Sequence, residues 1–312
     1  MTGEGVPPGL VVGVDGGTSA LRATAWAAST AARRHKPLLL VTAMDPPTPY
    51  GTGIGMPPDH FLEMETKGRA WLDRARSTAE RAGGPAEIGT ELVIGGATAT
   101  LAERAQHAAC TVIGGHAPQS HGGRLGAVAT GLMGHVPCPV AIVRWAGETE
   151  QAPEGGPVVG GVDGSPTSVE AVVVAYEEAA LRGAPLIAVH AASGSRRGLF
   201  HHHAEGPWGE GETAEAITLA ERLAGMREWY PEVEVERVVT RDAPRDALLG
   251  YARSAQLLVV GSTGHRELSG RLLGSTSHAL ARSAPCPLLV VPRGTRPEPQ
   301  RSRSRRREKT GP

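Results

Sequence analysis

The chain repeats itself at an offset of 148 residues, measured from Val14 to Val162. Val14-Asp15-Gly16 aligns with Val162-Asp163-Gly164, and near the far end of the unit Pro137-Cys138-Pro139 aligns with Pro285-Cys286-Pro287. An offset kept over so long a unit indicates a duplicated domain, because solenoid repeats have periods of roughly 20 to 50 residues. The sequence therefore predicts two domains that share one fold.

Length and composition fit this division. The chain has 312 residues, and half of that length is enough for a domain to bury its own core. Aromatic residues make up 4% of the chain, so the cores are expected to consist of Val, Leu, Ile and Ala, as in buried parallel sheets. We place the domains at residues 9–146 and 157–292, on either side of the Gly-, Pro- and charge-rich stretch 147–156, and expect the polar tail 293–312 to be disordered.

Short aliphatic runs alternate with helical patterns in each copy. In the second copy a helix is predicted over 168–181, with Ser165 as its N-cap and Pro166 in its first turn, and Asp242 and Pro244 are expected to open a later helix in the same way. This alternation predicts an α/β fold of two tandem Rossmann-like domains, each a five-stranded parallel sheet with helices on both faces. The strands predicted in the second copy are 157–162, 185–190, 233–239, 257–260 and 287–291.

A glycine pattern follows the fourth predicted strand of the second copy. It reads Gly261-x2-Gly264-x9-Gly274-Ser275 and leads into a helical stretch from Leu273 to Arg282. Glycine lacks the Cβ that keeps a phosphate away from the backbone, and a small hydroxyl residue at a helix start lies at the positive end of the helix. The pattern indicates a cradle for nucleotide phosphates, although two ordinary glycine turns around a loop would produce the same letters.

Ligands of open parallel sheets bind beyond the carboxyl ends of the strands. Asp163 ends the first predicted strand, His190 and Ala191 end the second, and the glycine pattern begins at the end of the fourth. We expect all of them on one rim, with Asp163 and the backbone near Ala191 framing a base while the glycines and Ser275 hold phosphates. Turn formation or helix capping would suit Asp163 equally well.

These residues resemble those of the universal stress protein family, in the tandem-domain form common in actinomycetes. The resemblance covers both copies, from about Leu10 to Arg144 and from Pro157 to Pro292. It rests on Val162-Asp-Gly-Ser-Pro166, Glu178-Ala-Ala-Leu-Arg-Gly-Ala-Pro185, Val189-His190-Ala191 and the glycine pattern with the Pro-Cys-Pro that follows it. The resemblance implies an ATP-binding domain in which Asp163 and Ala191 lie near adenine, and in which ribose and phosphates contact Gly261, Gly264, Gly274 and Ser275.

The resemblance also implies a stress-linked nucleotide binder or sensor. We therefore expect a sensor of stress or energy state that binds ATP, with a divalent cation such as Mg²⁺ on the phosphates. The chain contains no Walker A sequence, no paired catalytic carboxylates on a helix face and no serine nucleophile elbow, so an enzyme is not the first expectation. Two alternatives stay open: a slow ATP hydrolase or nucleotidyl-transfer enzyme with His265 or His190 moving the proton, and an interaction protein without a nucleotide. Family members commonly pair through the last strand, so a homodimer is expected, with a further protein partner that is unknown.

The first copy departs from the glycine pattern. Its fourth strand leads to Gly114-Gly115-His116-Ala117, and the later Gly126 is followed by Ala127 where the second copy has Ser275. The spacing and the hydroxyl are both lost, although Asp15 is kept. We therefore expect that the cradle does not survive in the first domain, that the second domain alone binds ATP tightly, and that the first is a structural or regulatory partner.

The remaining polar features favour simple interpretations. Cys110, which is expected to end an apolar helix, Cys138 and Cys286 show no zinc or CxxC spacing, so buried, inert thiols are predicted. Imidazole and carboxylate could form a metal site at His201-His202-His203, but three consecutive loop residues do not easily face one ion, so a solvated loop is favoured. The chain shows no signal peptide and no run of 18 apolar residues, which predicts a cytoplasmic protein without membrane contact.

The tail from Arg293 onward is basic. It holds eight basic and two acidic residues, so the rest of this formally neutral chain carries a charge of about −6. The segment Arg301-Ser-Arg-Ser-Arg-Arg-Arg307 could dock on nucleic acid, on an acidic partner or on the acidic body of the chain itself. No aromatic residue is interleaved for base stacking, which argues against nucleic acid.

Overall fold

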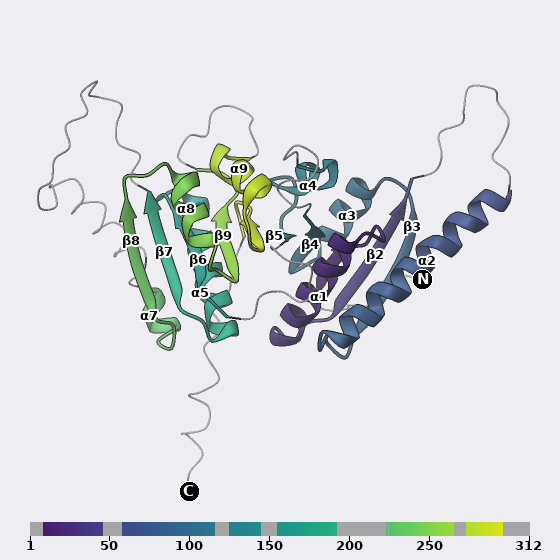
Figure 1. The fold of residues 1–312 in the computed structure, drawn as a ribbon, viewed down its shortest axis with the longest axis horizontal. Helices are drawn as coiled ribbons and strands as arrows, with labels where there is room; N and C mark the ends of the chain where they lie inside the picture. Colours follow the sequence, from purple (N-terminus) through teal and green to yellow (C-terminus); the bar gives the residue numbers. More distant parts are fainter. Residues whose placement is uncertain are drawn as a thin grey trace, which may run out of the picture.

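The computed structural model describes residues 9–45, 58–115, 125–144, 155–191, 223, 225–264 and 273–295. Within these residues the strands are β1 (Leu10–Gly13), β2 (Leu38–Met44), β3 (Ile88–Ile94), β4 (Cys110–Gly114), β5 (Val140–Val143), β6 (Val158–Val162), β7 (Leu186–Ala191), β8 (Val235–Thr240), β9 (Leu257–Gly261) and β10 (Leu288–Val291). They form one continuous sheet in the order β3-β2-β1-β4-β5-β10-β9-β6-β7-β8 (Figure 1).

The sheet consists of two equivalent domains. Strands β1 to β5 are parallel to one another, and β6 to β10 are parallel in the corresponding order. The predicted α/β fold of two tandem Rossmann-like domains is confirmed, and each strand expected in the second copy forms with its ends within two residues of the prediction. Strand order reverses between β1 and β4 and again between β6 and β9, which are the positions where such folds bind ligands.

The two domains join through their last strands. β5 and β10 run antiparallel, and the register places Leu288 opposite Ile142 and Val290 opposite Val140. All four side chains are buried. Both last-strand edges are therefore used inside one chain, and a homodimer, which stays a prediction, would need a different surface.

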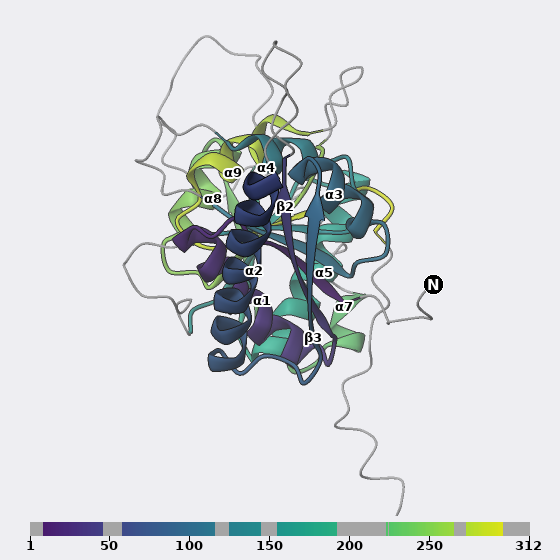
Figure 2. The same ribbon diagram turned by 90° about the vertical axis from the view of Figure 1, so that its right-hand side faces the viewer.

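Helices cover both faces of the sheet. One face packs in a hydrophobic cluster with α1 (Thr18–Arg33), α2 (Pro58–Arg81), α5 (Pro166–Arg182) and the single turn α7 (Met226–Trp229). The other face packs with α3 (Ala97–Ala105), α4 (Ala127–Leu132), α8 (Pro244–Ala252) and α9 (Ser275–Ser283). Figure 2 shows the molecule from the end at which α2 lies beside β2 and β3. Among the described helices none combines the length and the hydrophobicity needed to cross a bilayer.

The start of α5 follows the prediction. Ser165 is the N-cap, and its hydroxyl oxygen accepts a hydrogen bond from the N–H of Ser168 at 3.2 Å. Pro166 is the first helical residue, where a missing N–H costs nothing because that group would have no helical partner. The helix also ends as expected for a chain that must turn, with Gly183 in the left-handed region at φ 59°.

The start of α8 differs from the prediction. Pro244 is again the first helical residue, but Ala243 and not Asp242 holds the N-cap position, and no side chain caps the helix. The carboxylate of Asp242 instead accepts a hydrogen bond from the hydroxyl of Thr240, at 3.1 Å. The expectation that Asp242 opens this helix is wrong because its side chain is engaged by the last residue of β8.

The cysteine prediction is confirmed in its main point and wrong in one detail. Cys110, Cys138 and Cys286 are all free thiols with buried side chains. Cys110 does not end a helix, however, because α3 stops at Ala105 and Cys110 is the first residue of β4. Its apolar neighbourhood comes from the sheet, where it lies in register with Leu10.

Candidate functional site

The structure brings the predicted residues of the second domain to one rim. Asp163 follows β6, Ala191 ends β7 and Gly261 ends β9. β6 is hydrogen-bonded to both β7 and β9 in parallel register, so the carboxyl ends of the three strands lie at the same edge. Ala191 is partly buried at the end of its strand.

Gly264 lies directly against Asp163. A Cβ atom built on Gly264 would come 2.6 Å from Oδ2 of Asp163, closer than non-bonded atoms pack. The other oxygen of this exposed carboxylate, Oδ1, accepts a hydrogen bond from the N–H of Ser165 at 2.9 Å. The turn role considered for Asp163 is therefore present, and the second oxygen faces the glycine pattern.

The two ends of the glycine pattern meet in space. The N–H of Gly274 donates to the carbonyl of Ser262 at 2.7 Å, and a Cβ on Gly274 would lie 3.5 Å from the nitrogen of Gly264. The Gly274 N–H therefore closes the loop and is not free to donate to an anion. The intervening residues 265–272, which include His265, lie outside the described residues.

Ser275 begins α9, as the sequence predicted for the hydroxyl residue after the last glycine. Gly274 is the N-cap in extended conformation, and the first helical hydrogen bond runs from the N–H of His278 to the Gly274 carbonyl at 2.9 Å. The N–H groups of Ser275, Thr276 and Ser277 precede that bond and have no acceptor within the helix. They lie at the positive end of a nine-residue helix, an arrangement that suits a phosphate.

Gly261 has a packing reason to be glycine. A Cβ there would come 3.0 Å from the carbonyl carbon and oxygen of Thr167 in α5. The Gly261 carbonyl also accepts from the hydroxyl of Ser277 at 2.6 Å, and the hydroxyl of Thr167 donates to the carbonyl of Thr263 at 2.6 Å. Gly261 therefore sets the distance between β9 and α5, a role that sequence reasoning did not assign to it.

Of the two histidines considered for proton transfer, only His190 is described. Its Nδ1 lies 2.8 Å from the carbonyl oxygen of Val162, and because a carbonyl can only accept, Nδ1 carries the proton. The sheet thus orients the ring. His201, His202 and His203 lie outside the described residues, as does the tail beyond Thr295. In the parts of the chain that are described, no group of three or more His, Cys, Asp or Glu could hold a metal.

The first domain repeats the backbone of these turns. Oδ1 of Asp15 accepts from the N–H of Gly17 at 2.9 Å, as Asp163 does from Ser165. Gly126 is the N-cap of α4 with φ −63° and ψ 153°, close to −67° and 151° at Gly274. The main-chain path therefore persists although the glycine spacing and the serine are lost, whereas α4 has only six residues and α9 has nine.

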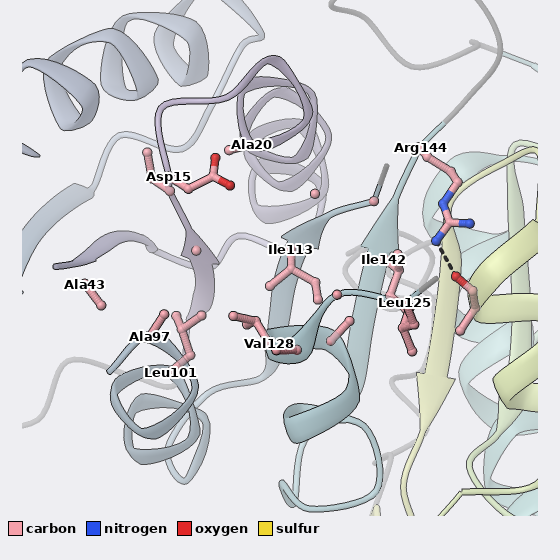
Figure 3. A pocket seen from close by; sticks show the side chains of 18 of the residues that line it. Asp15, Ala20, Ala43, Ala97, Leu101, Ile113, Leu125, Val128, Ile142 and Arg144 are labelled. Carbon is pink, nitrogen blue, oxygen red and sulfur yellow. Dashed lines mark hydrogen bonds between the residues drawn. The ribbon is translucent and has the colours of Figure 1, made fainter. Parts of the chain in front are cut away.

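A cavity of about 300 Å³ lies at this rim of the first domain (Figure 3). Figure 3 shows Asp15 and Arg144 on opposite sides of it, with Ile113 and Val128 between them. Its walls are mostly apolar, and α9 of the second domain contributes the residues Ala281 and Arg282.

Sequence reasoning missed this cavity because it judged the first copy by the phosphate pattern alone. The signal was Arg144, a charged residue directly after the apolar strand β5, at the position where the second copy has Pro292. A charged side chain directly after a buried strand lies at the ligand-binding rim of a parallel sheet. In the second copy the equivalent residue, Pro292, places no charge at that rim.

Comparison with known proteins agrees with the fold. A model described as the universal stress protein family matches residues 10–144 and 156–292. Two universal stress proteins of Mycobacterium tuberculosis are similar to this chain. One is 36% identical over 290 residues, covering 91% of this chain and 96% of the relative, and the other is 35% identical over 306 residues with the same coverage.

Solved structures show the same architecture. A universal stress protein from Archaeoglobus fulgidus superposes with a TM-score of 0.65 at 18% identity, covering 92% of this chain and 96% of that chain, and it shares the fold. A shorter universal stress protein, solved in complex with cAMP, covers 45% of this chain with a TM-score of 0.36, too loose a superposition for a comparison of sites. With the family model matching both halves and relatives aligned over nearly their whole length, the chain belongs to the universal stress protein family.

Proposed function

We propose that the chain is an ATP-binding sensor of stress or energy state, and that its second domain holds the nucleotide. The observation that carries this proposal is the closure of the glycine pattern, in which Gly264 lies against both the Asp163 carboxylate and Gly274. Gly264 thus lies between the Asp163 carboxylate and Gly274, the residue before α9. We place the sensor in the cytoplasm and expect it to act as a homodimer with a further protein partner.

Each group in the site has a distinct task in this proposal. Oδ2 of Asp163 accepts a hydrogen bond from the nucleoside, and the backbone at Ala191 borders the base. The free N–H groups at the start of α9 and the hydroxyl of Ser275 donate to phosphate oxygens, where the helix dipole adds positive potential. Gly261 and Gly264 keep β-carbons out of the space beside the ribose. Mg²⁺, when bound with the nucleotide, would neutralise part of the phosphate charge.

Occupancy itself is the signal in this scheme. A ligand that binds only the folded site stabilises it by mass action, by about 2.7 kcal/mol when its free concentration is a hundred times its Kd. The hydrogen bonds from Gly274 to Ser262 and from Ser277 to Gly261 tie the start of α9 to the end of β9, beside the turn that the ligand is proposed to contact. Filling the site therefore shifts the population towards the closed turn, which a partner protein can recognise.

The decisive test replaces Gly274 by valine. The Cβ itself fits, since its closest neighbour would be the Ser262 carbonyl oxygen at 3.4 Å, but the added methyl groups would occupy space at the start of α9. We expect Gly274→Val to stay folded by circular dichroism and to lose ATP binding in equilibrium dialysis. The matched control is Gly126→Val at the equivalent N-cap of the first domain, where a Cβ meets nothing within 4 Å.

The control should bind ATP like the parent, with one tight site per chain. Parent-like binding by Gly274→Val would show that the phosphates are held elsewhere. Two equal ATP sites in the parent, or loss of binding in Gly126→Val alone, would contradict the assignment to the second domain. Mass analysis of nucleotide extracted from freshly purified protein identifies which adenine nucleotide the site carries.

A further inference from the structure

Arg144 connects the first domain to a helix of the second. The residue follows β5 directly and is 5% exposed. Nη2 of its guanidinium donates to the carbonyl oxygen of Ala281 in α9, the contact drawn as a dashed line in Figure 3. Nε and Nη1 are buried and have no hydrogen-bond partner among the described residues. The Ala281 carbonyl is therefore the acceptor that the structure gives to this side chain.

The Ala281 carbonyl has no donor within its own helix. An α-helical carbonyl accepts from the N–H four residues later, and here that residue is Pro285, which has no N–H. The N–H of Ala284 donates to Leu280 instead, at 2.8 Å. Because Ala281 is completely buried, water cannot replace the missing donor. Without Arg144 this carbonyl would be a buried acceptor without a partner, which is unfavourable.

The first domain provides for the equivalent carbonyl by itself. Met133 precedes Ala281 by the repeat offset, and Pro137 again removes the helical donor. There Nδ1 of His135 lies 3.2 Å from the Met133 carbonyl oxygen, so the donor belongs to the same domain. The second domain has Ser283 at the position of His135, and its hydroxyl donates to a different carbonyl of α9. The end of α9 therefore depends on the neighbouring domain, whereas the end of α4 does not.

The charge of Arg144 strengthens this contact. The carboxyl end of a helix carries partial negative charge, which favours a cation beside it. Burial lowers the pKa of Arg144 to about 10, so the guanidinium stays charged at neutral pH. The side chain is also closely packed, since a Cβ on Gly115 would come 2.6 Å from its Nε. A buried cation is unfavourable by itself, and the end of α9 offsets part of that cost.

α9 links this contact to the proposed nucleotide site. The helix starts at Ser275, and Ala281 in its last turn lies roughly 9 Å further along the axis. Hydrogen bonds from Gly274 and Ser277 tie the start of the helix to the segment at the end of β9, and Arg144 ties its end to the first domain. Isolated helices shorter than about 12 residues are marginal in water, so a nine-residue helix relies on such contacts at both ends.

We propose that Arg144 is a positioning residue for the second-domain site: it holds the carboxyl end of α9 from the first domain, and the affinity of that site for nucleotide depends on this contact. The inference rests on the proposed function and gives the first domain the task of a regulatory partner. It requires no ligand in the first domain. Because coupling between two sites is reciprocal, a nucleotide at the start of α9 also strengthens the contact between the domains.

Two substitutions of Arg144 separate its hydrogen bond from its bulk. Arg144→Met keeps a long side chain in the same space and removes the donor and the charge. Arg144→Lys retains a cation that can donate to a single carbonyl, which is the one bond seen here. Arg34→Met is the matched control, because it breaks a different contact between the domains, with Glu178, on the face of the sheet opposite α9.

Hydrogen exchange of the nucleotide-free full chain tests the contact itself. We expect the amides in the last turn of α9 to exchange roughly tenfold faster in Arg144→Met than in the parent, because the helix end opens more often without a charged donor. Arg144→Lys should exchange nearly as the parent does, and Arg34→Met should leave α9 unchanged. Parent-like exchange of α9 in folded Arg144→Met would overturn the proposal.

Equilibrium dialysis with ATP tests the consequence for the site. We expect Arg144→Met to bind about fivefold more weakly than the parent, and Arg144→Lys and Arg34→Met to bind within about twofold of it. Equal affinities of the parent and Arg144→Met would overturn the proposal. An equal loss in Arg34→Met would also overturn it, because general loosening of the domains would then explain the effect. A parent that binds no ATP would instead overturn the proposed function, and the exchange comparison would still decide whether Arg144 holds α9.

Discussion

Arg34, directly after α1, donates a hydrogen bond to the carboxylate of Glu178 on α5, so the first domain supplies a partner for a buried acid of the second. A second nitrogen of Arg34 contacts Glu177 at 2.9 Å. Glu178 is also ion-paired with Arg182, whose guanidinium lies 5.6 Å from the centre of the Trp26 ring. The domains are therefore joined both by the β5–β10 strand pair and by this buried cluster of charges.

Removing Glu178 should destabilise the chain far more than removing its neighbour. In Glu178→Ala the Arg182 side chain, only 3% exposed, loses its acidic partner inside the protein, which typically costs about 3–5 kcal/mol. Glu177→Ala removes an acid that is 17% exposed and should cost about 1 kcal/mol or less. Urea denaturation curves of the two variants give this comparison, and equal midpoints would show that the cluster contributes nothing specific.

Gly264→Ala should disturb the nucleotide site from within. The new Cβ would meet Oδ2 of Asp163 at 2.6 Å, so the carboxylate must move, and we expect ATP to bind at least tenfold more weakly. Gly250→Ala in α8 is the matched control, because its Cβ meets nothing within 4 Å and should stabilise the helix by about 1 kcal/mol. Asp163→Ala combined with Gly264→Ala should relieve the overlap without restoring affinity. Restored affinity in that double variant would show that Asp163 does not contact the ligand.

The three thiols should be unreactive until the protein unfolds. Burial raises the pKa of Cys110 and of Cys286 to about 12, and it raises the pKa of Cys138 as well. Because the thiolate is the nucleophile, iodoacetamide at pH 8 should modify the native chain many-fold more slowly than free cysteine. Mass spectrometry should find three modified residues after denaturation in urea. Rapid labelling of any one thiol in the native chain would contradict its buried position.

Acid should weaken the link between β3 and α3. The Arg104 guanidinium, which donates to both oxygens of Glu91 at 2.9 and 2.7 Å, holds the pKa of that carboxyl below its ordinary value of 4.5. A carboxyl whose pKa is lower in the folded state contributes stability above its unfolded pKa and loses it as pH falls through the folded pKa. Parent and Glu91→Gln should therefore differ by about 1 kcal/mol at neutral pH, and the difference should shrink as the pH falls through the lowered pKa of Glu91.

Urea midpoints measured from pH 7 to pH 3 provide this comparison. The control is Glu80→Gln, which removes the ion pair between Glu80 and Arg76, two side chains that are each more than half exposed. Its urea midpoint should differ little from that of the parent at any pH. A gap between parent and Glu91→Gln that stays constant down to pH 3 would show that the carboxylate charge is not what stabilises this contact.

Local features of the sequence were sufficient to predict most of the fold. The five aliphatic runs of the second copy form strands where expected, because short β-branched segments bounded by Gly, Pro and Asp carry their own preference for the extended state. Ser165 and Pro166 start α5 for equally local reasons. Asp242 failed as a cap because a neighbour two residues away, Thr240, engages its carboxylate, and the letters alone do not show which of two local partners is chosen.

Local sequence features predicted only part of the candidate site in the second domain. The sequence indicated which residues share a rim, because the strand ends of a parallel sheet meet at one edge. It did not show that the Gly274 N–H donates to the Ser262 carbonyl, or that close contact with Thr167 requires a glycine at position 261. Both features depend on how closely segments distant in the sequence approach each other.

By itself the sequence determined that this protein consists of two copies of one parallel α/β domain, since duplication, strand position and glycine placement are properties of residues close together in the chain. Only the tertiary structure decided that β5 pairs with β10 inside one chain, and that α9 of the second domain closes the Arg144 cavity of the first. Contacts such as that between Arg144 and Ala281 join positions more than a hundred residues apart, and their geometry exists only once both domains have packed.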